Sequence, residues 1–324
     1  MPLTQREEHQ FDELGYVVKP GVFDTDAVLS LQTGLTEAVT VVGEQLVAAG
    51  RLSSTYEELG FERQLAAMFE EDIDAGKEAH GAVTGAGGGA FKEQAMLDFL
   101  RHPPLIDCIT QLVGPEIIGS SVYRVRPKVP AYDRGEVPWH QDGGYLLAHC
   151  DQDLMVTCWI PLVDATQENG CLYVLPGQHR EGIFKHYTGG HAGYLEIAPE
   201  DLPTPQPVCC PMKAGDVLFM TNRTPHASFA NTTDVVRWSI DLRYHDFSVP
   251  NNVDEPPEAY TPEREPVTMA CHPSEADFVI RYPEDPSREV TRVEEFQEIR
   301  ARYEKIRPKS PGRGWTPLKE RKQV

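Results

Sequence analysis

The sequence contains no long hydrophobic run. Hydrophobic residues make up 40% of its 324 residues, but they never form the stretch of about 18 consecutive apolar residues that a membrane-spanning helix needs. The first residues, MPLTQREEHQFDELGY, also lack the apolar segment of a secretory signal. We therefore predict a chain that has no membrane partner and is not secreted.

Cysteine is scarce and is not spaced for cross-linking. The chain has seven cysteines, an odd number, and none of them forms a CxxC pair. Disulfide frameworks need paired cysteines and an oxidising compartment. The pattern favours a reducing compartment, and we predict a cytoplasmic location.

Basic residues are also few, because 30 Lys and Arg stand against 50 Asp and Glu, which gives a formal net charge of -20. Nucleic-acid binding depends on neutralising phosphates with Lys and Arg, so the composition argues against a nucleic-acid partner. An anionic small molecule would need a local basic cluster that opposes the field of the whole chain.

Glycine gathers at one place, GAVTGAGGGA over residues 81–90. No GK[ST] follows it, so this stretch does not form a phosphate-binding loop. Two interpretations stay open for it: a flexible connector, or a lid that orders over a bound substrate.

The first third of the chain is predicted to be helical. A helix capped by Asp24 or Thr25 should run to Gly50, because apolar residues recur there at alternating steps of three and four. These residues are Val28, Leu31, Leu35, Val39, Val42 and Leu46. Further helices are expected near residues 55–75, over 91–100, and from Pro103 to Gly114.

Short β-rich runs separated by turn residues follow Gly114. They are IIGSSVYRVRP, LMVTCWIPLV, GCLYVLP, GDVLFMT and VVRWSIDLRYH. Many short strands of this kind predict a sandwich or barrel, with the helices against one outer face. We see no repeat and no clean linker, so we predict one domain over 1–324, with a mainly helical part (11–114), a β core (115–246) and a C-terminal extension (247–324). Its basic end, RPKSPGRGWTPLKERKQV, is expected to be a surface arm or partly disordered.

The stretch VPWHQDGGYLL, residues 137–147, indicates a metal site. Residues two apart in a strand point to one face, so His140 and Asp142 would present an imidazole and a carboxylate together. His226, which follows the strand-like GDVLFM, can supply a third ligand. Two histidines and one carboxylate form the facial triad of non-haem Fe(II) oxygenases. The alternative is that His140 and Asp142 form an ordinary surface pair.

Arg237 follows His226 by eleven residues, inside VVRWSIDLRY. A strand here places Ser239 and Asp241 on the same face as Arg237. The guanidinium group can grip a carboxylate with two hydrogen bonds, and Ser239 can add a hydroxyl. The open positions of the metal can then hold a bidentate cosubstrate and O₂.

These residues and their surroundings resemble the phytanoyl-CoA dioxygenase family of Fe(II)/2-oxoglutarate-dependent oxygenases. The resemblance covers most of residues 11–245, through FDELGYVVKPGVF, VPWHQD, CWIPLVDATQENGCLYVLPGQHR, GDVLFM, PHAS and RWSIDLRY. It implies a mainly β fold with N-terminal helices around a double-stranded β-helix, the cupin-like jelly roll. It also implies that Fe(II), 2-oxoglutarate and O₂ are the cofactors and cosubstrates, with the metal held by His140, Asp142 and His226.

The same resemblance implies which residues bind 2-oxoglutarate. Arg237 matches the residue that binds the C5 carboxylate, and Ser239 is expected beside it. Trp159 matches a position that packs against the cosubstrate, and Lys92 matches another cosubstrate contact. The implied reaction is hydroxylation of an unactivated C–H bond of a small molecule, with release of succinate and CO₂. Desaturation and ring chemistry stay open.

Two other functions are weighed against this one. The first is an inactive family member that serves as a binding module, although an inactive copy need not keep His140, Asp142, His226 and Arg237. The second is a metal-dependent jelly-roll enzyme that does not use 2-oxoglutarate, but Arg237 favours a keto-diacid. Succinate release that depends on Fe(II), O₂ and 2-oxoglutarate distinguishes all three.

A basic stripe precedes the metal segment in SVYRVRPKVP. Arg124, Arg126 and Lys128 share one face of the expected strand, and together with Gln141 they are candidate substrate contacts. Three cations in so acidic a chain reverse the local field, which predicts a substrate with a carboxylate, phosphate or CoA thioester group. A solvated strand face is the alternative. The sequence does not predict the oligomeric state.

Overall fold

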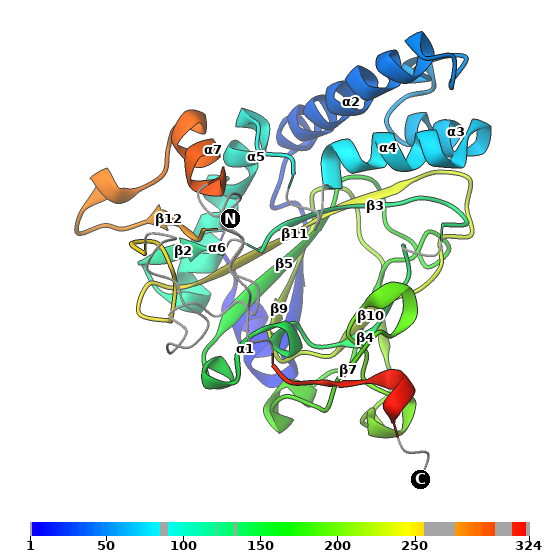
Figure 1. Ribbon diagram of the computed structural model, residues 1–324. Helices are drawn as coiled ribbons and strands as arrows, with labels where there is room; N and C mark the ends of the chain where they lie inside the picture. Colours follow the sequence, from blue (N-terminus) through cyan, green and yellow to red (C-terminus); the bar gives the residue numbers. More distant parts are fainter. Residues whose placement is uncertain are drawn as a thin grey trace.

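Two antiparallel sheets form the centre of the computed structural model, with helices packed along one of them (Figure 1). The structure describes residues 2–84, 90–120, 122–132, 135–255, 276–301 and 313–321. The main sheet has the strand order β1-β9-β5-β11-β2-β12, and β3 also pairs with β11. The minor sheet has the order β4-β10-β6-β8, and β13 pairs with β7 in parallel.

The bounds of the elements are as follows. The helices are α1 (Gln5–Leu14), α2 (Thr25–Ala48), α3 (Gln64–Glu71), α4 (Ile73–Thr84), α5 (Gln94–Leu100), α6 (Pro103–Val113) and α7 (Val293–Ala301). The strands of the main sheet are β1 (Tyr16–Lys19), β2 (Ile117–Gly119), β3 (Arg124–Lys128), β5 (Met155–Pro161), β9 (Val217–Thr221), β11 (Arg237–Asp246) and β12 (Phe278–Arg281). Those of the minor sheet are β4 (Val137–His140), β6 (Leu172–Val174), β8 (Val208–Cys210) and β10 (His226–Ser228), and the short pair is β7 (Tyr187–Thr188) and β13 (Thr316–Pro317).

Helices α2 and α6 confirm the predicted apolar spacing and boundaries. Helix α2 begins after Asp24, whose carboxylate accepts a hydrogen bond from the Ala27 amide at 2.9 Å. Its residues of the predicted stripe are buried except for Val42, which is partly buried against the core. Helix α6 starts at the two prolines and ends at Gly114, as expected.

The single helix predicted near residues 55–75 is wrong. The chain makes a short 3₁₀ turn (Glu57–Leu59), then α3 and α4. Gly60, with φ of 79°, interrupts the first part, and the extended Asp72 separates the two helices. The Asp72 carboxylate accepts hydrogen bonds from the amides of Asp74 and Ala75, so it caps the new helix. Helix α4 continues to Thr84, and residues 85–89 of the glycine-rich stretch lie outside the described residues.

Strand β11 divides its side chains between two environments. Trp238, Ile240, Leu242 and Tyr244 are buried in the large apolar core that the main sheet shares with the helices. The alternate residues, Arg237, Ser239, Asp241 and Arg243, point to the opposite side, into the space between the two sheets. The helices therefore cover one outer face of the β core, as predicted, and leave the inner face for polar residues.

The described parts of the C-terminal extension pack against the rest of the chain. Strand β12 adds to the main sheet beside β2, and α7 packs against it through Phe296 and Phe278. Residues 313–321, which we expected to be a surface arm, lie against the β core. Among the described helices, none has the length and apolar character needed to cross a bilayer.

Candidate active site

Two histidines face each other across neighbouring strands of the minor sheet. His226 in β10 pairs with His140 in β4, and their ring centroids are 4.2 Å apart. Each ring contacts the carbonyl two residues earlier through Nδ1, at 2.9 Å to Pro138 and 3.0 Å to Thr224. These bonds place the proton on Nδ1, so both Nε2 atoms keep a lone pair for a metal.

Asp142 completes a group of three possible ligands. Its Oδ1 lies 4.0 Å from Nε2 of His140, and the ligand atoms of both histidines and Asp142 all lie within 4.8 Å of one another. The strand ends at His140, and Asp142 begins a 3₁₀ turn (Asp142–Tyr145). The carboxylate reaches the histidines through this turn and not, as predicted, by strand alternation.

The two glycines after Asp142 let the turn pass between packed neighbours. A Cβ atom on Gly143 would lie 2.4 Å from Cδ1 of Ile183, and one on Gly144 would lie 2.8 Å from the ring of His186. The Gly143 amide donates to the carbonyl of Asn222 at 2.7 Å. Asn222 directly follows β9, so this bond anchors the turn to the end of that strand. Larger residues would push the turn, and Asp142 with it, out of place.

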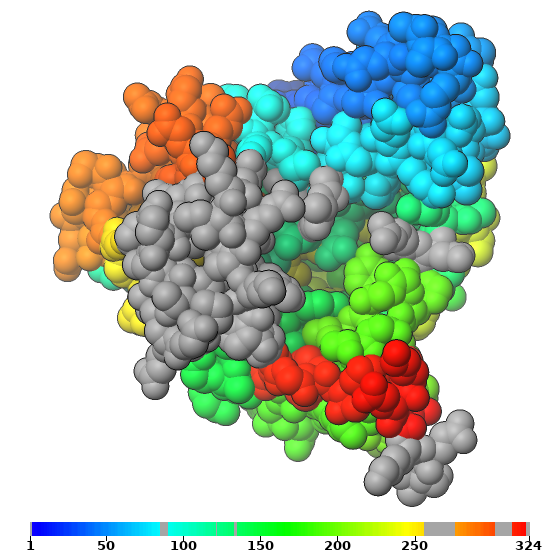
Figure 2. Space-filling model, viewed as in Figure 1, coloured from blue at the N-terminus to red at the C-terminus, as the bar shows by residue number. Residues whose placement is uncertain are grey.

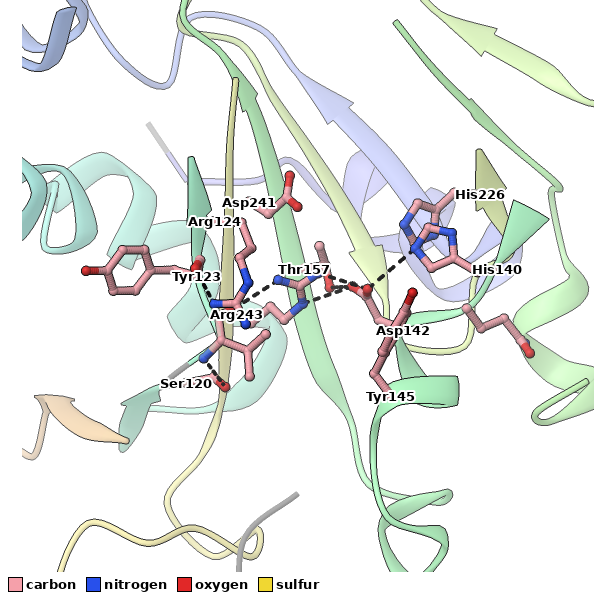
Figure 3. A network of polar contacts seen from close by, with 12 residues as sticks. Ser120, Tyr123, Arg124, His140, Asp142, Tyr145, Thr157, His226, Asp241 and Arg243 are labelled. Atoms are coloured by element: carbon pink, nitrogen blue, oxygen red, sulfur yellow. Dashed lines mark hydrogen bonds and ion pairs between the residues drawn. The ribbon is translucent and has the colours of Figure 1, made fainter. Parts of the chain in front are cut away.

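Arg243 and Thr157 hold the Asp142 carboxylate from the main sheet (Figure 3). Arg243 donates from Nη2 to Oδ1 at 2.9 Å and from Nε to Oδ2 at 3.1 Å, and the Thr157 hydroxyl donates to Oδ2 at 2.5 Å. Burial alone would raise the pKa of Asp142, but the charge and hydrogen bonds of Arg243, together with the two histidines, outweigh it and hold that pKa below its ordinary value. The carboxylate is therefore ionised and fixed in orientation.

We did not single out Arg243 from the sequence, although a signal was present. It continues the period-two series of Arg237, Ser239 and Asp241 in RWSIDLRY. The register pairs it with Thr157 of β5, so both partners of Asp142 lie side by side on the inner face.

The donor set fits Fe(II). Burial and the nearby His226 ring hold the pKa of His140 well below its ordinary value, so this imidazole is neutral. Two imidazoles that bond through Nδ1 to backbone carbonyls, and one ionised carboxylate, are the ligands that non-haem Fe(II) prefers. Three protein ligands leave positions for a cosubstrate and O₂.

Arg237 offers a buried positive charge that lacks a full set of partners. Its Nη1 donates to the Ser239 hydroxyl at 2.5 Å, while its Nε has no hydrogen-bond partner among the described residues. The guanidinium lies over the Trp159 ring, 5.1 Å from the centroid. Burial lowers the pKa of Arg237 to about 10. An unsatisfied buried cation of this kind fits a bound carboxylate, such as the far end of 2-oxoglutarate.

Lys128 lies next to Arg237 and is buried. The two residues are partners in the β3–β11 register. The Lys128 ammonium group donates to the Ser228 hydroxyl at 2.6 Å and to the Phe229 carbonyl. Burial, followed by the charge of Arg237, lowers the pKa of Lys128 to about 6. The side chain is deeply enclosed at 2% exposure, so it is not a solvated strand face.

Arg126 is partly exposed beside Asp241, and its role as a substrate contact stays a prediction. Its Nε donates to the Asp241 carboxylate at 2.9 Å, and 33% of its side chain remains exposed. It also interacts electrostatically with Tyr145, whose ring meets His140 edge-on at 5.9 Å. Arg124, the third residue of the stripe, donates to the Tyr123 carbonyl at 2.7 Å (Figure 3).

Two other candidates have different surroundings. The Gln141 amide is buried, with its nitrogen donating to the Gly182 and Arg223 carbonyls and its oxygen accepting from the Phe184 amide. This side chain links loops through both its nitrogen and its oxygen, and its role as a substrate contact stays a prediction. Lys92 precedes α5, and its carbonyl accepts a hydrogen bond from Gln297. Its role in cosubstrate binding stays a prediction.

Comparison with known sequences identifies consistent relatives. The family model described as phytanoyl-CoA dioxygenase (PhyH) matches residues 11–239. Phytanoyl-CoA dioxygenase domain-containing protein 1 of Danio rerio is 23% identical over 259 residues, covering 72% of this chain and 87% of that protein. The methylphosphonate hydroxylase of Gimesia maris is 34% identical over 149 residues, covering 45% of this chain and 52% of that protein.

Solved structures share the fold. The non-heme monooxygenase ThoJ in its apo form has a TM-score of 0.54 and 18% identity, covering 92% of this chain and 95% of ThoJ. EvdO2 from Micromonospora carbonacea var. aurantiaca, complexed with 2-oxoglutarate, has a TM-score of 0.50 and 21% identity, covering 75% of this chain and 91% of EvdO2. These likenesses confirm the jelly-roll core with N-terminal helices.

Proposed function

The chain belongs to the phytanoyl-CoA dioxygenase family and is an Fe(II)/2-oxoglutarate-dependent oxygenase, and from this premise we propose that it hydroxylates an unactivated C–H bond of an anionic small molecule. Succinate and CO₂ are the coproducts. The observation that carries the proposal is the combination of the His140, Asp142 and His226 group with a buried, incompletely bonded Arg237 on the facing sheet.

Each residue has a defined task in this proposal. His140, Asp142 and His226 hold the iron, which supplies O₂ activation when 2-oxoglutarate is bound. Arg237 binds the far carboxylate of 2-oxoglutarate, with the Ser239 hydroxyl bonded to the same guanidinium and Trp159 against it. Lys128, the register partner of Arg237, lies beside that carboxylate. The negative charge of a bound carboxylate would compensate the lost hydration of Arg237 and favour the protonated form of Lys128.

One measurement tests the reaction class. The purified protein is supplied with Fe(II), O₂ and 2-oxoglutarate, and succinate is measured with and without each component. Succinate that needs all three supports the proposal. Turnover of a substrate without 2-oxoglutarate would favour the metal enzyme of another class, and no turnover with any substrate would favour a binding module.

Arg243 is expected to act as a positioning residue for the metal ligand Asp142. Arg243→Lys keeps a positive charge but loses the fork that contacts both carboxylate oxygens. Partners of a metal ligand typically contribute 10- to 100-fold to metal affinity, so we expect the Fe(II) dissociation constant to rise by about 10-fold or more. Anaerobic Fe(II) titration measures it.

Arg101→Lys is the matched control for Arg243→Lys. Arg101 also pairs with a carboxylate, Glu289, at 2.9 Å, but this pair lies outside the inner face of the sheets. The Arg101→Lys variant should therefore bind Fe(II) with the affinity of the parent protein. Equal Fe(II) affinity in Arg243→Lys and the parent protein would remove Arg243 from this role.

The argument for an anionic substrate rests on Arg126. Its Nε is used by Asp241, and the two terminal nitrogens have no hydrogen-bond partner among the described residues, while a third of the side chain stays exposed. Burial raises the pKa of the neighbouring Tyr145 to about 12, so its hydroxyl stays protonated and can donate. A guanidinium edge and a hydroxyl beside His140 suit a carboxylate, phosphate or phosphonate group.

The relatives guide the choice of compounds for a substrate screen. Their names include a methylphosphonate hydroxylase and phytanoyl-CoA dioxygenases. We therefore place small phosphonates, carboxylates, phosphate esters and acyl-CoA thioesters in a screen for stimulated succinate release. Neutral isosteres of each active compound serve as the comparison set.

Arg126→Glu is expected to weaken binding of the substrate that the screen identifies. Charge reversal replaces an attractive contact with a repulsive one, so the half-saturation concentration of the substrate should rise by ~10-fold or more at low salt. The half-saturation concentration of 2-oxoglutarate should not change. Turnover is measured at two ionic strengths, with Arg51→Glu, a change on the helical layer, as control. If Arg126→Glu behaves like the parent in both salts, a neutral substrate becomes the better proposal.

A further inference from the structure

The described C-terminal residues 313–321 lie against the β core, and in space they are well separated from α7 (Figure 1). In the space-filling view this segment covers part of the surface formed by residues of the middle of the chain (Figure 2). Strand β13 pairs in parallel with β7 through Thr316 and Tyr187, and Arg321 forms an ion pair with Glu200 at 3.1 Å. The family match ends at residue 239, so it does not account for this segment.

Arg313 binds the turn that carries the metal ligand Asp142. Its Nη1 donates to the carbonyls of Gly143 at 3.2 Å and Leu146 at 3.1 Å. The same guanidinium makes two bonds to the Asp151 carboxylate, at 2.5 and 2.6 Å, so its charge is balanced. Only 8% of the Arg313 side chain is exposed. One side chain therefore ties together both ends of the turn and the segment after it.

Trp315 binds the same turn between these two points. Its indole Nε1 donates to the Gly144 carbonyl at 2.8 Å, and its ring packs against His186 at 5.3 Å between centroids. The ring nitrogen Nε2 of His186 accepts a hydrogen bond from the backbone amide of Gln141 at 2.9 Å. Trp315 thus reaches the residues on both sides of Asp142, Gly144 directly and Gln141 through His186.

We propose that Arg313 and Trp315 are positioning residues of the metal centre, and that the C-terminal segment is a working part of the active site. The inference rests on the metal site of the proposed function. The glycines that let the turn pass between its neighbours also make it pliable, because glycine has the widest backbone freedom. Three carbonyls bonded from outside restrict that freedom and hold Asp142 in register with the two histidines.

The test uses the full chain with Co(II), a probe that does not react with O₂ as Fe(II) does. Co(II) is titrated in the presence of 2-oxoglutarate and followed by its visible absorption. Hydrogen exchange of the amides in residues 142–147 is measured without metal. Arg313→Ala and Trp315→Ala should raise the Co(II) dissociation constant by ~10-fold or more and speed exchange in this turn.

Three further variants separate positioning from general loss of structure. Arg313→Lys keeps the charge for Asp151, and Trp315→Phe keeps the ring beside His186, so both should recover part of the Co(II) affinity. Arg321→Ala lies in the same segment but contacts Glu200, and it should match the parent in both measurements. Thermal unfolding midpoints identify any variant that fails to fold.

The outcomes distinguish this inference from the proposed function. Parent-like Co(II) affinity in Arg313→Ala and Trp315→Ala overturns the inference, even if exchange becomes faster, because the segment would then cover the turn without positioning Asp142. If His226→Ala also binds Co(II) like the parent, the metal site itself is wrong, and the inference falls with it. Loss of affinity in His226→Ala but not in Arg313→Ala rejects the inference alone.

Discussion

His226→Ala is expected to abolish stoichiometric Fe(II) binding. The change leaves one imidazole and one carboxylate, and the cross-strand partner of His140 is gone. Because an incomplete facial triad cannot hold Fe(II) against solvent at micromolar metal, bound iron after anaerobic gel filtration should fall to near zero. Succinate release should fall with it. Removing one buried side chain at the edge of the site should still permit folding, which circular dichroism checks.

The control for His226→Ala is His149→Ala. His149 is exposed and lies in the segment that follows the metal-binding turn, so it tests whether any histidine of this region affects iron. It should bind one equivalent of Fe(II) and turn over normally. Stoichiometric iron with normal turnover in His226→Ala would show that the third ligand is another residue.

Arg237→Ala is expected to raise the half-saturation concentration of 2-oxoglutarate by about 100-fold, since a charge-assisted bidentate contact typically contributes a few kcal/mol. Fe(II) affinity without 2-oxoglutarate should change little, because His140 and His226 lie on the minor sheet and Asp142 in the turn after β4, whereas Arg237 lies on the main sheet. Succinate release at graded 2-oxoglutarate, with Fe(II) saturating, measures the effect.

Two variants sharpen the Arg237 experiment. Arg237→Lys keeps the charge but not the fork, so its half-saturation concentration should lie between those of the parent and Arg237→Ala. Arg281→Ala removes another arginine of the main sheet, one that contacts Thr110 on the helical side, and should have no effect. An unchanged requirement for 2-oxoglutarate in Arg237→Ala would assign the cosubstrate to a different cation, with Lys128 as the first candidate.

The sequence alone predicted the features that depend on the regular spacing of apolar and polar residues along one segment. The apolar spacing predicted α2 and its buried face, and period two predicted that Arg237 and Ser239 share a side of one strand. The same alternation, continued two residues beyond Asp241, also places Arg243 on this side of the strand.

The features that the sequence did not predict depend on contacts between distant segments. Lys128 is buried because β3 pairs with β11 over more than 100 residues of chain, and nothing in SVYRVRPKVP indicates that pairing. The break between α3 and α4 depends on one extended residue, Asp72. Arg313 reaches a turn that lies about 170 positions earlier, and the basic, Pro-rich composition around it suggested only an exposed tail.

The division of β11 into two sets of side chains has an evolutionary consequence. The residues that fill the apolar core and the residues that face the space between the two sheets alternate on one strand. A mutation at Asp241, or at its ion-pair partner Arg126, therefore alters the polar inner face while the packing of Ile240 and Leu242 against the helices is retained. Related chains can diverge in the molecules they accept and still fold by the same contacts. Substrate preference can therefore change faster than the fold during evolution.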